Sequence, residues 1–101
     1  MSIAPSTKEQ KMSVKINISS LLQHITNGIK TTEVKGHTVG ECLEDLIKQF
    51  PRMEQVLFSK KGELHSYVDI YVNKESAYPD ELAKPVKDGD ELTIALLIGG
   101  G

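Results

Sequence analysis

The chain ends in three consecutive glycines, Gly99, Gly100 and Gly101, which directly follow an apolar segment. Glycine has no β-carbon and loses more backbone freedom on ordering than other residues, so we expect a flexible tail that is exposed to solvent. Fully extended, three residues reach on the order of 10 Å. The carboxylate of Gly101 can then pass through a narrow channel into another protein's active site, where a side chain would clash. We interpret the tail as a stalk that presents its own carboxylate as the reactive group.

A folded domain must hold this tail, and its first part is predicted to be a β-hairpin. Apolar and polar residues alternate over residues 14–19, which is typical of a strand with one buried face. Residues 29–35 are rich in Thr and Val and predict a second strand, and Asn27-Gly28 is a strong turn signal between the two. We expect three apolar loop residues to cover the edge of the core: Leu21, Leu22 and Ile25.

One main helix follows the hairpin. Thr38 and Glu41 match a capping box, with Thr38 as N-cap, and Pro51 ends the helix. We expect residues 52–58 to form a short helical turn that packs Val56 and Leu57 against the core. The apolar residues of the main helix recur at the spacing of one helical face: Val39, Cys42, Leu43, Leu46, Ile47 and Phe50.

Two further strands complete the pattern. Residues 68–72 alternate as a strand, and the turn-rich stretch 73–85 leaves room for a short edge strand. Asp88-Gly89 predicts a turn into a final strand over residues 92–97. A hairpin, a crossing helix and then further strands is the order of a β-grasp domain, so the first and last strands are expected to be central neighbours.

The predicted fold class is therefore α+β, a β-grasp (ubiquitin-like) domain with a mixed sheet of about four to five strands and one main helix on one face. We divide the chain into a disordered N-terminal tail (1–11), the β-grasp domain (12–98) and a flexible glycine tail (99–101).

The face of the sheet opposite the helix is expected to be open beside the root of the tail. By the alternation of the strands it carries Tyr67, Tyr71, Ala95 and Leu97. An apolar patch of this kind indicates a docking surface for a partner. The alternative is that these side chains are isolated apolar residues without a binding role.

Composition narrows the class of protein. The chain has 101 residues and 11.1 kDa, enough for one core. A formal charge of −2 gives no basic field for nucleic acid, and no apolar run approaches the roughly 20 residues of a membrane helix. The polar first residues lack the apolar segment of a secretory signal, so we expect a cytoplasmic protein.

No residue set indicates catalysis or a metal site. Cys42 lies on the apolar helix stripe, where a small buried residue is the usual explanation and a sulfur-bearing thiol is the alternative. The three histidines, His24, His37 and His65, lie in different elements without metal-ligand spacing. We therefore predict that the chain is not an enzyme and has no catalytic residue of its own.

The turn at residues 87–92 (KDGDEL), the order of elements and the terminal Gly-Gly resemble the ThiS/MoaD family of ubiquitin-like sulfur carriers over about residues 12–101. Residues 62–73 (GELHSYVDIYVN) resemble most closely the members that carry sulfide for cysteine biosynthesis and related MoaD-like proteins. The chain departs from the family pattern in its third glycine, Gly99. It also has Leu-Leu-Ile at 96–98, where the molybdopterin branch has a proline-containing stretch.

The resemblance implies a mechanism. An E1-like adenylyltransferase would use ATP to adenylate the carboxylate of Gly101, and a sulfur donor would displace AMP to leave a thiocarboxylate. Gly99 and Gly100 would enter the channel of the enzyme. A sulfur-accepting biosynthetic enzyme would then take the sulfur, for a product of the cysteine/methionine or the molybdopterin/thiamine type. The chain would bind no cofactor, and we expect a monomer when it is free.

Two alternatives share the fold. A ubiquitin-like protein modifier would be joined through Gly101 to lysines of target proteins. A plain interaction module would carry a glycine tail without chemical use.

Overall fold

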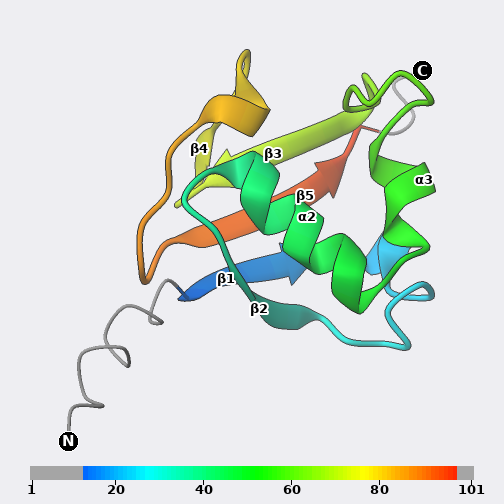
Figure 1. Ribbon diagram of the computed structural model, residues 1–101. Coiled ribbons are helices and arrows are strands. Elements are labelled where there is room, and N and C mark those ends of the chain that lie inside the picture. Colours follow the sequence, from blue (N-terminus) through cyan, green and yellow to red (C-terminus); the bar gives the residue numbers. More distant parts are fainter. Residues whose placement is uncertain (1–12, 98–101) are drawn as a thin grey trace, which may run out of the picture.

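The computed structural model describes residues 13–97. Five strands form one mixed sheet in the order β2-β1-β5-β3-β4, and helix α2 crosses one face of that sheet (Figure 1). This arrangement confirms the β-grasp fold predicted from the order of elements. The predicted N-terminal tail (1–11) and glycine tail (99–101) lie outside the described residues.

The described residues form five strands, two α-helices and two 3₁₀ turns. In chain order they are β1 (Ser13–Ile18), the 3₁₀ turn η1 (Ser20–Leu22), β2 (Thr31–Lys35), α2 (Val39–Gln49), α3 (Met53–Leu57), β3 (Val68–Val72), β4 (Glu75–Ser76), the 3₁₀ turn η2 (Glu81–Ala83) and β5 (Glu91–Leu96).

The first and last strands are the centre of the sheet, as predicted. Strand β1 pairs in parallel with β5, with Ile16 opposite Leu92 and Ile18 opposite Ile94. Strand β2 is antiparallel to β1, and β3 is antiparallel to both β5 and β4. Because alternate residues face alternate sides, the inward positions of all four long strands meet in one core. These inward residues are at most 5% exposed: Val14, Ile16, Ile18, Val34, Val68, Ile70, Leu92 and Ile94.

The loop between β1 and β2 is more compact than a simple hairpin turn. The Thr26 hydroxyl is fully buried and donates to the carbonyl oxygen of Ile29 at 2.8 Å. Leu22 and Ile25 cover the core edge as predicted, whereas the prediction for Leu21 is wrong, since it is 50% exposed. Consecutive residues of a 3₁₀ turn point about 120° apart, so Leu21 and Leu22 cannot both face the core.

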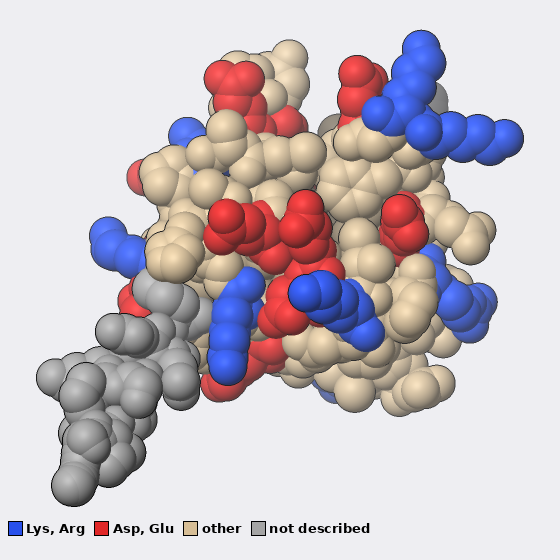
Figure 2. Space-filling model, in the orientation of Figure 1, with Lys and Arg blue, Asp and Glu red and all other residues tan. Residues whose placement is uncertain are grey.

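Helix α2 begins at the predicted cap. The Glu41 N–H donates to Oγ1 of Thr38 at 3.1 Å, and Oε1 of Glu41 accepts from the His37 N–H at 2.7 Å. The first bond satisfies one of the backbone donors that a helix start leaves free, while the second ties Glu41 to the residue before the N-cap. The apolar stripe faces the sheet, while acidic side chains gather over the outer face of α2 (Figure 2).

The short helix α3 packs on the core through both predicted residues. Leu57 is fully buried, and the half-buried Val56 packs against the core cluster. Met53 is also fully buried because it lies one turn before Leu57 on the same helical face. No helix within residues 13–97 is long and apolar enough to cross a bilayer.

A polar network fixes the turn that leads into β5. The Asp90 carboxylate accepts from Nδ2 of Asn73 at 3.0 Å and from the Lys87 N–H at 2.9 Å. Oδ1 of Asn73 in turn accepts from the Glu91 N–H at 3.0 Å. The hydrogen bond from Asn73, followed by that from Lys87, lowers the pKa of Asp90 below its usual 3.8. The network therefore ties the start of the last strand to the end of β3.

This lowered pKa makes a prediction about stability. The native state favours ionised Asp90, so its contribution is fully present above the ordinary pKa near 3.8 and is lost as pH falls through the lower native value. We expect Asp90→Asn to reduce the free energy of unfolding by about 1 kcal/mol at pH 7, a modest loss because the network faces solvent. Urea unfolding at pH 7 and pH 3 measures this. A difference between wild type and variant that does not shrink at pH 3 would contradict it.

Candidate functional site

The described chain ends beside the sheet at Leu97. The Leu97 N–H donates to the carbonyl oxygen of Tyr67 at 2.7 Å, which extends the pairing of β5 with β3 by one position. The side chain of Leu97 is nevertheless 59% exposed. The root of the tail is thus fixed to the central strands by its backbone and presents an apolar side chain to solvent. The tail residues Gly99, Gly100 and Gly101 lie outside the described residues.

Tyr71 and Ala95 lie on the open face of the sheet, as predicted. Ala95 is opposite Asp69, and Tyr71 is opposite Thr93, while the residues between them point into the core. Both Tyr71 and Ala95 are half-buried. The Asp69 carboxylate, first through hydrogen bonding and then through its charge, raises the pKa of Tyr71. This face therefore combines a neutral phenol, a small apolar side chain and a carboxylate that the sequence analysis did not single out.

Tyr67 is held differently from the other predicted docking residues. Its ring stacks on His65 with centroids 4.8 Å apart, and its hydroxyl donates to the carbonyl oxygen of Val56 in α3 at 3.3 Å. Tyr67 lies in a turn closed by the Val68 N–H on the His65 carbonyl oxygen, before β3 begins. The two-residue alternation of a strand consequently does not set its direction. The structure brings Tyr67 next to Leu97 through the backbone but ties its ring to α3.

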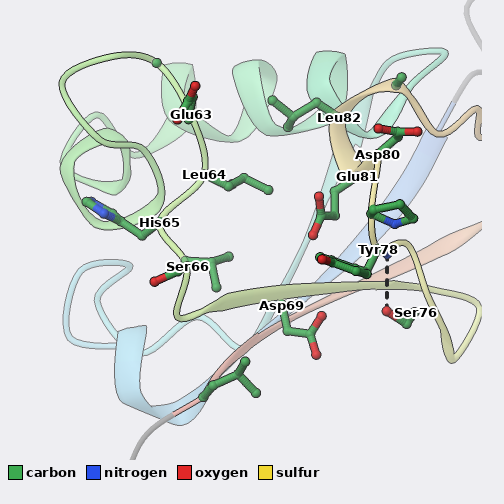
Figure 3. Close-up of a pocket in the computed structure, with 15 residues that line it drawn as sticks. Glu63, Leu64, His65, Ser66, Asp69, Ser76, Tyr78, Asp80, Glu81 and Leu82 are labelled. Atoms are coloured by element: carbon green, nitrogen blue, oxygen red, sulfur yellow. Dashed lines mark hydrogen bonds between the residues drawn. The ribbon is translucent and has the colours of Figure 1, made fainter.

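Leu97 also lines a groove that the sequence analysis missed. This groove, of about 1010 Å³, lies between the loop at residues 62–66 and the segment at residues 78–83. In Figure 3, Leu64 and Leu82 extend from these two walls toward one another. Both walls are turn-rich segments without periodicity, so no sequence pattern predicted that they would face each other.

The η2 wall of the groove is set by a close approach to α2. A β-carbon on Gly40 would lie 3.0 Å from the carbonyl oxygen of Leu82, which is tighter than ordinary packing. A glycine in the first turn of α2 therefore lets η2 pack directly on the helix. The position of this wall depends on that tertiary contact.

Cys42 and the histidines do not form a site. Cys42 is fully buried, and burial, followed by the nearby Glu41 charge, raises the pKa of its thiol to about 11. The thiol is therefore neutral near pH 7 and poorly suited to carry or transfer sulfur as a thiolate. Within residues 13–97 no group of three or more His, Cys, Asp or Glu side chains is placed to hold a metal ion.

Comparison with known proteins gives consistent matches over nearly the whole chain. The model of the ThiS family matches residues 16–101. The sulfur carrier protein CysO of Mycobacterium tuberculosis is 34% identical over 93 residues, which cover 89% of this chain and 100% of CysO. A chain of the crystal structure of the Amycolatopsis orientalis BexX/CysO complex is 35% identical with a TM-score of 0.79, covering 87% of this chain and 99% of that one. The crystal structure of SAMP1 from Haloferax volcanii is 28% identical with a TM-score of 0.78, covering 88% and 99%.

Proposed function

Because the chain belongs to the ThiS family, we propose that it is a sulfur carrier of the CysO type. The observation that carries the proposal is the match to CysO along that protein's full length, together with the three terminal glycines. The chain serves as a protein co-substrate. Its partners supply the catalytic groups.

The proposed chemistry takes place at the carboxylate of Gly101. A carboxylate oxygen attacks the α-phosphorus of ATP in an E1-like adenylyltransferase, and pyrophosphate leaves. Sulfide from a donor then attacks the acyl carbon, AMP leaves, and a thiocarboxylate remains. Adenylation is needed because a carboxylate is a poor electrophile until its leaving group is good. A sulfur-accepting biosynthetic enzyme then removes the sulfur from Gly101.

The described geometry supports this proposal through the rigidity of the tail root. Strand β5 lies between β1 and β3, and the Leu97 N–H is bonded to Tyr67. Four residues follow Leu97, and they reach about 14 Å at most. An enzyme that acts on Gly101 must therefore contact the domain near Leu97, so the surface there takes part in recognition.

Intact mass spectrometry tests the proposal. The protein is incubated with ATP, its E1-like enzyme and a sulfide source. We expect a mass gain of one oxygen-for-sulfur exchange that maps to Gly101. The Cys42→Ser variant should give the same gain, whereas a persulfide on Cys42 would add a whole sulfur atom and vanish in that variant. Conjugates on other proteins without a sulfur gain would indicate a modifier, the class of protein that the name of SAMP1 denotes. No mass change of either kind would overturn both functions.

The exposed side chain of Leu97 gives a prediction about docking. We expect Leu97→Glu to lower kcat/KM for adenylation about tenfold, because the substitution places a charge in an apolar contact. Stability should be unchanged because Leu97 is 59% exposed. Pyrophosphate release at varied carrier concentration measures the effect.

Ile29→Glu is the matched control. Ile29 is 41% exposed and lies in the loop before β2, the edge strand that is separated from β5 by β1. The kcat/KM of Ile29→Glu for adenylation should stay within about twofold of wild type, because this surface position lies outside the proposed contact. Equal effects of the two variants would show that Leu97 has no specific docking role.

A further inference from the structure

The groove beside Leu97 has an apolar interior that the sheet leaves uncovered. Leu64 extends from one wall, and Val68 and Leu97 contribute from the ends of β3 and β5. Strand β4 pairs only with Tyr71 and Val72, so it stops short of the half of β3 that borders the groove. The groove therefore stays open along the edge of the sheet, between its two walls.

The charged side chains that line this groove are all acidic. Four carboxylates line it, from Glu63 on one wall, Asp80 and Glu81 on the other, and Asp69 on β3 (Figure 3). No Lys or Arg is among the described residues that line it, and none of the four carboxylates forms an ion pair within residues 13–97. A cleft lined by charges of one sign focuses the electrostatic field inside it. This groove therefore favours an occupant with positive charge.

Position links the groove to the tail. Leu97 lines the groove, and the four residues that follow it lead to the carboxylate of Gly101. An enzyme that holds Gly101 lies within about 14 Å of Leu97. The surface of that enzyme is therefore close enough to the groove to insert a segment into it.

We propose that this groove docks a peptide segment of the activating enzyme that carries both basic and apolar side chains. The inference rests on the proposed function and names a recognition surface for it. Apolar side chains of the segment would pack on Leu64 and Leu97, and its Lys or Arg side chains would face Asp80 and Glu81. Complementary charge of this kind acts mainly on the rate of encounter and on specificity.

The first test compares two double variants with the same change in net charge. Asp80→Asn with Glu81→Gln neutralises the groove, and neither side chain makes a hydrogen bond within the described residues. Glu33→Gln with Glu44→Gln neutralises two exposed carboxylates on β2 and α2, outside the groove. We measure adenylation at about 20 mM and about 300 mM salt, roughly a fifteenfold span across the screening range.

We expect the groove variant to raise KM about tenfold at low salt with kcat unchanged, and the difference to shrink at high salt. The control variant should stay within about twofold of wild type. Equal KM values for the two double variants would overturn the proposal.

A second measurement separates the groove from the proposed function. If wild type forms no adenylate or thiocarboxylate, the carrier function fails, and the groove is judged by NMR. The ¹⁵N-labelled chain is titrated with the capped peptide Lys-Leu-Lys-Leu-Lys and with its Glu-Leu-Glu-Leu-Glu counterpart. Saturable shifts on both walls with the basic peptide only, lost in the groove double variant, would support the site. Shifts elsewhere, or none, would overturn it.

Discussion

Removal of Gly100 and Gly101 is expected to abolish sulfur loading completely. The deletion leaves the chain two residues shorter, so its new carboxylate falls about 7 Å short of the position that Gly101 would reach. A reacting atom displaced by far less than this already loses orders of magnitude in rate. Intact mass after incubation with ATP, the activating enzyme and sulfide measures the loss. Stability should not change, because the tail follows the last described backbone pairing at Leu97.

A graded series shows whether the loss reflects reach or sterics. Gly100→Ala keeps the length and adds one β-carbon, so the rate of sulfur loading should fall strongly if the channel of the enzyme is narrow. A wild-type chain with one extra C-terminal residue no longer presents the carboxylate of Gly101, so it should not be loaded there. Sulfur loading of the truncated chain at the wild-type rate would contradict the proposal that Gly101 is the reactive residue.

Ile94→Ala is expected to have the largest effect on stability. Ile94 lies in the middle of the central strand β5, opposite Ile18 on one side and Ile70 on the other, and is 1% exposed. Its truncation removes buried apolar surface and leaves a cavity that the paired strands cannot close. We expect a loss of about 3–4 kcal/mol in the free energy of unfolding, a large share of the roughly 5–15 kcal/mol of an ordinary domain. Urea unfolding followed by circular dichroism measures it.

Leu97→Ala is the matched control, since it also shortens an apolar side chain at the end of the same strand. Leu97 is 59% exposed, and its loss should cost less than about 0.5 kcal/mol. A similar cost for both variants would mean that the burial of the central strand does not determine stability. The pair also separates stability from recognition, because Ile94 holds the fold and Leu97 belongs to the proposed docking surface.

Several features of this protein followed from the sequence alone, because they depend on local physics. The Thr38–Glu41 cap requires only residues within one helical turn, and the structure shows the Glu41 N–H bonded to Thr38 and the Glu41 carboxylate bonded to the His37 N–H. The inward face of β5 follows from a two-residue period that holds wherever a strand is paired. The order of elements then left few ways to build a sheet, and the central position of β1 beside β5 was among the predictions, whereas their parallel direction came from the structure. The role of the glycine tail as a stalk for the carboxylate of Gly101 was likewise predicted from residue types, whereas its sulfur chemistry was implied by the family resemblance.

The tertiary structure decided the features that sequence periodicity does not predict. Tyr67 lies one residue before β3, so its direction is set by a turn, by the His65 ring and by a carbonyl of α3. The acidic groove exists because two aperiodic segments face each other across the edge of the sheet, with one wall seated on the helix at Gly40. Contacts between segments distant in sequence depend on how the whole chain packs, and no local pattern encodes them. The sequence thus determined the domain and pointed to its proposed reactive end, while the packing determined the surface beside Leu97, from which that end extends.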